Sequence, residues 1–181
     1  MANALTALRL LLVFPFAFFM TRAEPRYSIL ALVAMAAAII TDILDGPIAR
    51  RTGAVSPASG TFDHASDFLF VTCGLFAGAW RGVFPWILPA LITVAFAQYF
   101  IDSYWIHRHG GLRRSPLGRY NGILYFVPLC LEIAIGLGLG FLHPVLTLLV
   151  WALVLSTLVS IAQRLAFMVA REKLPAGPAQ K

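Results

Sequence analysis

Charged residues are scarce in this chain of 181 residues: they make up 12% of it, and only eight are acidic. Hydrophobic residues make up 60%, and no long polar segment separates them. A water-soluble domain of this length cannot bury so much apolar surface, so that class is excluded. Cysteine is equally rare. Cys73 and Cys130 form no CxxC motif, which excludes a disulfide framework and a cysteine-based zinc site.

Long apolar runs recur along the chain, and several are long enough to cross a bilayer. We expect an all-α, polytopic membrane protein with six transmembrane helices, joined by short stretches rich in Arg, Gly, Pro or His. The expected spans are approximately residues 4–21, 27–48, 61–80, 84–106, 120–142 and 144–170. Residues 1–170 then form one transmembrane domain, and 171–181 form a disordered C-terminal tail.

The basic residues indicate how these spans are oriented. With six spans, both termini and the second and fourth loops share one side of the membrane, which then carries eleven of the fourteen Lys and Arg residues. Both termini are therefore expected to be cytoplasmic, in the inner membrane of a bacterial cell. The net charge of +6 follows from this asymmetry and from attraction to anionic membrane lipids. No basic soluble domain is present to bind nucleic acid.

Half of the acidic residues crowd into one stretch, DILDGPIARRTGAVSPASGTFDHASD. Asp42 and Asp45 share a face at the end of the second span, and Asp63 and Asp67 share a face at the start of the third. The Gly- and Pro-containing stretch between them suits a chain reversal, which sets two carboxylates against two others. Four carboxylates so close remain ionised only beside positive charge. Such an all-oxygen site suits Mg²⁺, Mn²⁺ or Ca²⁺ rather than Zn²⁺.

Small and basic residues accompany these aspartates. Gly46 and Ala49 leave room for a ligand to approach the backbone, and Arg50 can grip a phosphate through two hydrogen bonds. This combination predicts a substrate that bears phosphate. Helix capping would explain Asp63 alone, but not two aspartates at the end of the preceding helix, where negative charge is disfavoured.

The spacing of these residues closely resembles the signature of the CDP-alcohol phosphatidyltransferases: Asp42-x-x-Asp45-Gly46-x-x-Ala49-Arg50, then eight residues, Ser59, three residues, Asp63, three residues and Asp67. The family usually has glycine where Ser59 stands, and Gly60 follows at once, so either residue is a candidate for that position. The resemblance implies a six-helix membrane domain that transfers a phosphatidyl group from CDP-diacylglycerol to the hydroxyl of a small polar alcohol and releases CMP. It also implies a homodimer.

The same resemblance assigns roles to the motif. Two divalent ions, Mg²⁺ or Mn²⁺, are held by Asp42, Asp45, Asp63 and Asp67. Asp67 also accepts the proton of the attacking hydroxyl. The CDP moiety is contacted by Gly46, Ala49, Arg50 and either Ser59 or Gly60.

The identity of the acceptor alcohol stays open. The opening segment NALTALRLLLVFPF resembles the first helix of the phosphatidylglycerophosphate synthases of this family, with Asn3, Thr6 and Arg9 as a polar stripe, which favours glycerol 3-phosphate. Arg119, in the basic loop HRHGGLRRSPLGRYNG, is a candidate for binding a phosphate on that acceptor. Inositol phosphate, phosphatidylglycerol and serine are alternatives, because the residues after the last two aspartates depart from the synthase pattern.

A divalent-cation transporter is the alternative from a different class, with the four aspartates as its ion site. Transporter sites lie near the bilayer midplane, usually on broken helices, whereas these carboxylates are expected at one membrane face. Two further polar residues, Gln98 and Asp102, are one helical turn apart in the fourth span. We expect them to hold helices together by pairing with Arg9 or Arg164. Glu132 is expected at a helix or subunit interface.

Overall fold

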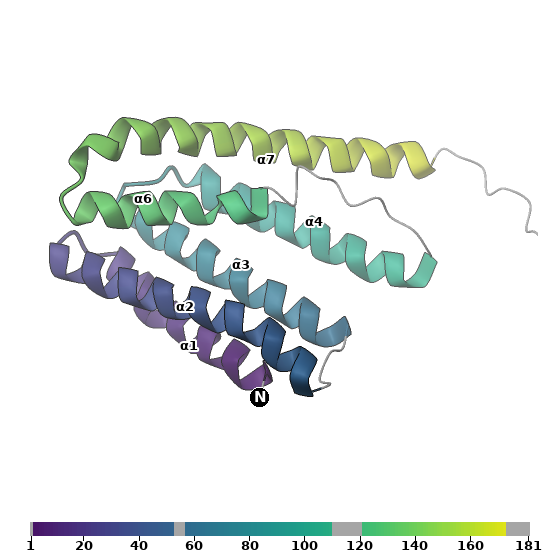
Figure 1. Ribbon diagram of the computed structural model, residues 1–181. Helices are drawn as coiled ribbons and strands as arrows, with labels where there is room; N and C mark the ends of the chain where they lie inside the picture. Colours follow the sequence, from purple (N-terminus) through teal and green to yellow (C-terminus); the bar gives the residue numbers. More distant parts are fainter. Residues whose placement is uncertain (1, 53–56, 110–120, 173–181) are drawn as a thin grey trace, which may run out of the picture.

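The computed structural model describes residues 2–52, 57–109 and 121–172, with side chains over 7–44, 65–101 and 121–166. Residues 173–181, most of the predicted tail, lie outside this description. Within it, every regular element is helical (Figure 1), which confirms the all-α prediction. The elements are α1 (Ala2–Met20), α2 (Pro25–Thr52), α3 (Pro57–Trp80), α4 (Ile87–His109), α6 (Phe126–Gly136), the 3₁₀ turn η1 (Gly140–Leu142) and α7 (His143–Glu172).

The helices run antiparallel to their neighbours in sequence. α1 packs against α2 and α3, α4 packs against α7, and α6 contacts α2, α3 and α7. In Figure 1 the start of α1, the end of α2, the start of α3 and the ends of α4 and α7 all lie toward the same end of the bundle. We call this the hairpin end, because α2 ends and α3 begins there.

Proline and glycine set several helix boundaries. α2 and α3 begin at Pro25 and Pro57, and proline suits the first helical position because its missing N–H is not needed there. α3 ends in a Schellman arrangement, in which the N–H of Val83 donates to the carbonyl of Gly78 at 2.9 Å. The intervening Gly82 has a φ of +83°, which a residue with a side chain rarely adopts.

One expected span is shorter than predicted. The sequence predicts a helix over 120–142, whereas α6 covers only Phe126–Gly136 and follows a separate helical turn at 121–124. Pro128 disturbs the start of the helix because it has no N–H to donate to the carbonyl of Leu124. Gly138, with a φ of +108°, ends the helix at the segment GLGLG, whose glycines have low helix propensity.

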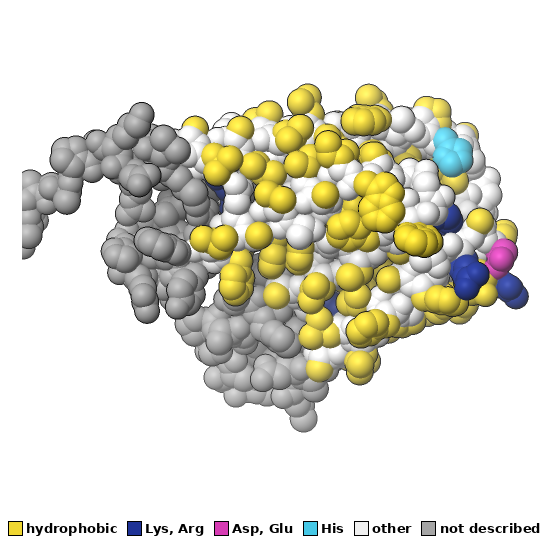
Figure 2. Space-filling model, turned by 180° about the vertical axis from the view of Figure 1, so that it is seen from behind, with side chains coloured by type: hydrophobic (Ala, Val, Ile, Leu, Met, Phe, Trp, Pro, Cys, Tyr) yellow, Lys and Arg dark blue, Asp and Glu magenta, His cyan; other side chains and the backbone are white. Residues whose placement is uncertain are grey.

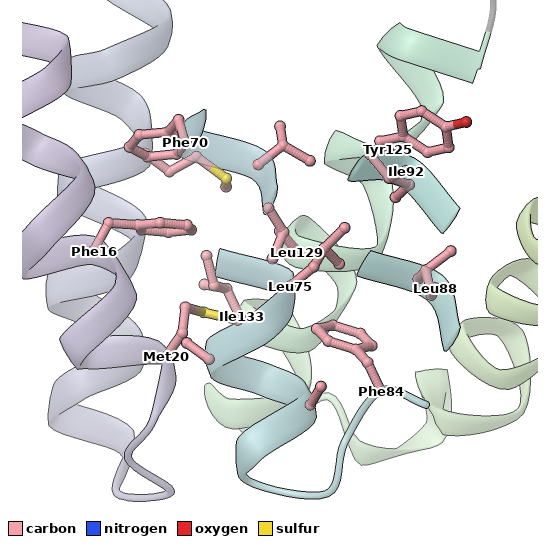
Figure 3. Close-up of a cluster of buried hydrophobic side chains, with 14 of the residues drawn as sticks. Phe16, Met20, Phe70, Leu75, Phe84, Leu88, Ile92, Tyr125, Leu129 and Ile133 are labelled. Carbon is pink, nitrogen blue, oxygen red and sulfur yellow. The ribbon is translucent and has the colours of Figure 1, made fainter. Parts of the chain in front are cut away.

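A close contact joins α1, α3 and α6 in the core (Figure 3). The rings of Phe16 and Phe70 stack with their centroids 4.3 Å apart and their planes 18° from parallel, and both side chains are buried. Gly74 makes this approach possible, because a Cβ there would lie 2.5 Å from Cε1 of Phe16 and 3.1 Å from Cδ2 of Leu129. Small residues let membrane helices pack closely in this way.

The outside of the bundle is apolar. Figure 2 shows one face covered largely by hydrophobic side chains, with charged ones gathered at one end. Exposed large hydrophobic side chains include Leu11, Phe14, Val33, Phe100 and Leu148. Two segments of the described chain, Pro25–Leu44 and Gly140–Ala166, are long and apolar enough to cross a membrane, and four shorter apolar helices accompany them. An exterior of this kind suits contact with lipid.

An ion pair lies at the end opposite the hairpin end. Arg81, in the turn after α3, pairs with Glu132 of α6 and also donates to the backbone carbonyl of Arg22. The side chain of Glu132 is only 6% exposed and that of Arg81 only 19%. The pair therefore joins α6 to two interhelical turns, and it puts Glu132 at a contact between elements of this chain.

Candidate active site

α1 carries a buried cation to the hairpin formed by α2 and α3. Arg9 is only 1% exposed. Phe16 lies seven residues further along α1, which is two helical turns and the same face. Because Phe16 stacks on Phe70 of α3, the face of α1 that carries Arg9 is turned toward α3.

The guanidinium of Arg9 joins the two halves of the aspartate motif. Its Nη2 donates to Oδ1 of Asp42 on α2 at 2.9 Å, and its Nη1 donates to Oδ1 of Asp67 on α3 at 2.6 Å. Nη1 also donates to the buried hydroxyl of Ser66, 3.0 Å away. Charge-assisted bonds of this kind are the strong ones in proteins. The structure therefore gathers one aspartate from each half of the motif at a single cation.

The two carboxylates are more accessible than the cation between them. The side chain of Asp42 is 46% exposed and that of Asp67 is 29% exposed, against 1% for Arg9. Arg9 thus supports the carboxylates from inside the bundle, while both remain reachable from outside. A guanidinium so deeply buried among apolar helices depends on its carboxylate partners, because an unpaired buried charge is costly.

The donor chemistry of this site fits a divalent metal. Two carboxylates from neighbouring helices meet, and Mg²⁺ and Mn²⁺ prefer oxygen ligands of this kind. The helical backbone of α2 includes Asp45 and that of α3 includes Asp63, which puts these positions on the same helix faces as Asp42 and Asp67. The side chains of Asp45 and Asp63 lie outside the described residues. Among the side chains that are described, no three His, Cys, Asp or Glu form a metal-binding group.

The residues predicted to contact the nucleotide occupy the two helix ends next to the aspartates. Their backbone is helical, in the last turns of α2 for Gly46, Ala49 and Arg50, and in the first turn of α3 for Ser59 and Gly60. Their side-chain surroundings lie outside the described part of the chain, and Arg119 lies outside it entirely. The contacts of these residues with a nucleotide or an acceptor therefore stay predictions.

Neither Arg9 nor Ser66 is predicted from the sequence to contact the aspartates, yet the guanidinium of Arg9 bonds to Asp42 and Asp67. The expected pairing of Gln98 and Asp102 with Arg9 or Arg164 stays a prediction, because the side chain of Asp102 lies outside the described residues. One signal was available: Arg9 is the only charged residue in the first expected span, and ionisable residues at membrane depth usually have a function. Ser66 carries no comparable signal, because a single serine in a helix is common.

A second polar group connects the residues just before α6 with α7. The hydroxyls of Tyr125 and Thr157 are 2.8 Å apart, and the hydroxyl of Ser156 donates to Oδ1 of Asn121 at 2.9 Å. Tyr125, Thr157 and Asn121 are buried, so these bonds lie inside the bundle. They join the start of α6 to α7 inside the bundle, where buried polar groups need hydrogen-bond partners.

Aromatic contacts connect α4 with the helices on either side of it. Phe68, the neighbour of Asp67 on α3, stacks on Phe96 of α4 with ring centroids 3.8 Å apart. The guanidinium carbon of Arg164 on α7 lies 5.8 Å from the ring centroid of Tyr99 on α4. α3 therefore packs against α4 at the residue next to Asp67, and α4 packs against α7.

The sequence of the chain is similar to that of known proteins. The sequence profile of the CDP-alcohol phosphatidyltransferase family matches residues 1–170. A curated relative, the CMP-forming cardiolipin synthase of Streptomyces coelicolor, is 30% identical over 80 residues, which cover 44% of this chain and 37% of the relative. The match thus spans little more than a third of that synthase, and no solved structure matches the chain. Because the family profile extends over nearly its whole length, the chain belongs to the CDP-alcohol phosphatidyltransferase family.

Proposed function

We propose that the protein is a membrane enzyme of phospholipid synthesis that transfers a phosphatidyl group from CDP-diacylglycerol to the hydroxyl of a small polar alcohol and releases CMP. The observation that carries this proposal is the meeting of Asp42 and Asp67 on the guanidinium of Arg9. Chemistry at a pyrophosphate needs carboxylates from both helices, so that divalent ions can be held around it. Family membership and the CMP-forming relative support the same reaction.

In this reaction the acceptor oxygen attacks the phosphorus that bears diacylglycerol. The bond from that phosphorus to the oxygen of CMP breaks, and CMP leaves with the bonding electrons. Asp67 takes the proton of the acceptor hydroxyl, and its exposed fraction of 29% leaves the carboxylate accessible for that step. Arg9 keeps this carboxylate in place, and Ser66 accepts a hydrogen bond from the same nitrogen of Arg9.

The remaining motif residues bind the substrate. Asp42, Asp45, Asp63 and Asp67 would hold two divalent ions, Mg²⁺ or Mn²⁺, which would supply positive charge to stabilise the departing CMP. The small residues of the motif leave room for the pyrophosphate against the helix backbone, and the arginine binds one of its phosphates. These contacts belong to Gly46, Ala49 and Arg50, with Ser59 or Gly60 beside them.

We place the enzyme in the bacterial inner membrane as a six-pass protein with the hairpin end at the cytoplasmic face. α1 to α4 and α7 contain 19, 28, 24, 23 and 30 residues, and a bilayer requires about 20. The remaining pass consists of α6, with 11 residues, together with the helical turn at 121–124 before it and η1 after it. The basic residues of the sequence favour this orientation. The acyl chains of CDP-diacylglycerol then stay in the bilayer while the acceptor arrives from the cytosol. From the family resemblance we also propose that the enzyme is a homodimer.

Glycerol 3-phosphate is our first candidate for the acceptor. The N-terminal segment supports it, and Arg119 in the basic loop is suited to its phosphate. Phosphatidylglycerol is the second candidate, because the curated relative is a cardiolipin synthase and cardiolipin results when phosphatidylglycerol supplies the hydroxyl. Inositol phosphate and serine complete the panel that needs testing.

A divalent-cation transporter fits the site less well. Asp42 and Asp67 lie within continuous helices, whereas transporter ion sites usually form where helices are broken. The buried Arg9 also puts a fixed positive charge against both carboxylates, which opposes the passage of cations.

A CMP-release assay on the purified protein tests the proposal. CDP-diacylglycerol in mixed micelles is supplied with Mn²⁺ or Mg²⁺ and with each acceptor in turn. We expect release with one acceptor, and a loss of about 100-fold or more in Asp67→Asn, because the proton acceptor is removed. Glu24→Gln is the control, since Glu24 pairs with Arg26 in an exposed position and should leave activity unchanged. No release with any acceptor, together with Mn²⁺ uptake by proteoliposomes, would favour the transporter.

A further inference from the structure

We infer that Arg9 is a built-in counter-ion of the aspartate site: it holds Asp42 and Asp67 together when no metal is bound, and it lowers the affinity of the site for divalent cations. The inference rests on the proposed function in one respect, which is that these aspartates bind metal. It assigns to Arg9 the role of a positioning residue rather than a catalytic one.

In the metal-free protein, Arg9 lies between the carboxylates of Asp42 and Asp67. Two ionised carboxylates that meet between helices repel each other, and a cation between them removes that repulsion. Arg9 bonds to one oxygen of each, at 2.9 Å and 2.6 Å, from a third helix. A guanidinium keeps its charge at every accessible pH, and its planar fork suits two carboxylates at once. Arg9 therefore closes the α2–α3 hairpin without help from a metal.

In the metal-bound protein, Arg9 and the metal bind the same two carboxylates. A divalent cation on Asp42 and Asp67 comes close to a guanidinium that cannot lose its charge. Arg9 cannot turn to solvent either, because it is 1% exposed and packed on the inner side of the carboxylates. Like charges at short range in an apolar environment repel strongly. The arginine and the metal thus compete for the same negative charge, and Arg9 weakens metal binding.

Removing the charge of Arg9 should therefore have two opposite effects. The metal-free protein should lose stability, because the two carboxylates then lose the cation that bonds to both of them. The metal should bind more tightly, because its competitor is gone. An arginine that merely supports the fold predicts the reverse for metal binding, since a loosened site holds its ligand less well.

The test compares Arg9→Met with Arg9→Lys and with Arg81→Met. Arg81 is the matched control, because it is also a largely buried, ion-paired arginine but lies at the other end of the bundle. Melting temperatures are measured in EDTA and in saturating Mn²⁺, and the Mn²⁺ dissociation constant is measured by electron paramagnetic resonance. We expect Arg9→Met to melt lower than wild type in EDTA and to recover most of the difference in Mn²⁺. Arg81→Met should lose the same amount in both conditions.

The binding data give the sharper comparison. Arg9→Met should bind Mn²⁺ at least about tenfold more tightly than wild type, which corresponds to about 1.4 kcal/mol. Arg9→Lys keeps the charge and should stay within about threefold of wild type. Weaker Mn²⁺ binding by Arg9→Met, or an equal loss of melting temperature with and without Mn²⁺, overturns the inference. If Arg9→Met does not fold, Arg9→Gln allows the same comparison, because it keeps N–H donors without the charge.

These measurements are independent of CMP release. A wild-type protein that releases no CMP but shows the expected Mn²⁺ effects would refute the proposed function and support the inference. A wild-type protein that releases CMP but gains no stability from Mn²⁺ would refute the inference alone.

Discussion

Replacing Gly74 with alanine should separate α1 from α3 at the contact that sets the position of Arg9. The new Cβ would lie 2.5 Å from Cε1 of Phe16 and 3.1 Å from Leu129, and at the shorter distance something must move. Phe16 has little freedom to turn away, because it is fully buried and stacked on Phe70. We expect α1 to shift away from α3, which stretches the bonds that Arg9 makes two helical turns before Phe16.

The size of the effect follows from the packing. Overpacking a well-filled core by one methyl group costs about 1–3 kcal/mol. For a protein of this length, 1 kcal/mol lowers the melting temperature by about 2–4 °C, so the expected fall is about 2–12 °C. CMP release should fall by about 10- to 100-fold, because a displacement of about 1 Å at reacting groups costs that much. Both effects have one cause, the displacement of α1 from α3.

Tryptophan fluorescence during thermal unfolding in detergent measures the first effect, and the CMP-release assay measures the second. Gly122→Ala is the matched control, because nothing lies within 4 Å of the Cβ it would add. Alanine also favours a helix by up to about 1 kcal/mol over glycine, so this variant should melt at or slightly above the wild-type temperature. A Gly74→Ala protein that melts with wild type, or a Gly122→Ala protein that loses as much, would refute the packing argument.

Three other perturbations test the site and the far end of the bundle. Asp42→Asn should weaken Mn²⁺ binding by about tenfold or more, measured by electron paramagnetic resonance, since it removes a charged ligand; unchanged binding would exclude Asp42 as a ligand. EDTA should abolish CMP release, and added Mn²⁺ or Mg²⁺ should restore it; release that persists in EDTA would exclude metal-dependent transfer. Glu132→Ala should destabilise the protein by about 1–3 kcal/mol in thermal unfolding, because it removes the carboxylate partner of the partly buried Arg81. The exposed Glu24→Ala should change stability by less than about 1 kcal/mol, and equal effects would contradict the ion-pair argument.

Local sequence signals predict most of the helices of the fold. The spacing of Pro, Gly and apolar residues located five long helices to within four residues at each end, because these signals act on neighbouring residues alone. The sixth expected span was too long. The proline at 128, just after the break at Tyr125, and the glycine at 138, just after the end of α6, were also local signals, but the apolar character of 120–142 masked them.

The sequence by itself determined the helical class, the family and the motif, since periodicity puts Asp42 and Asp45 on one helix face and Asp63 and Asp67 on another. Only the tertiary structure shows which cation contacts the aspartates on those two helix faces. Arg9 lies on a different helix, and its reach to Asp42 and Asp67 depends on how Phe16, Phe70 and Gly74 set α1 against α3. The spacing of residues along one helix cannot predict a contact among three helices. That contact depends on how the side chains of the three helices fit together in the packed protein.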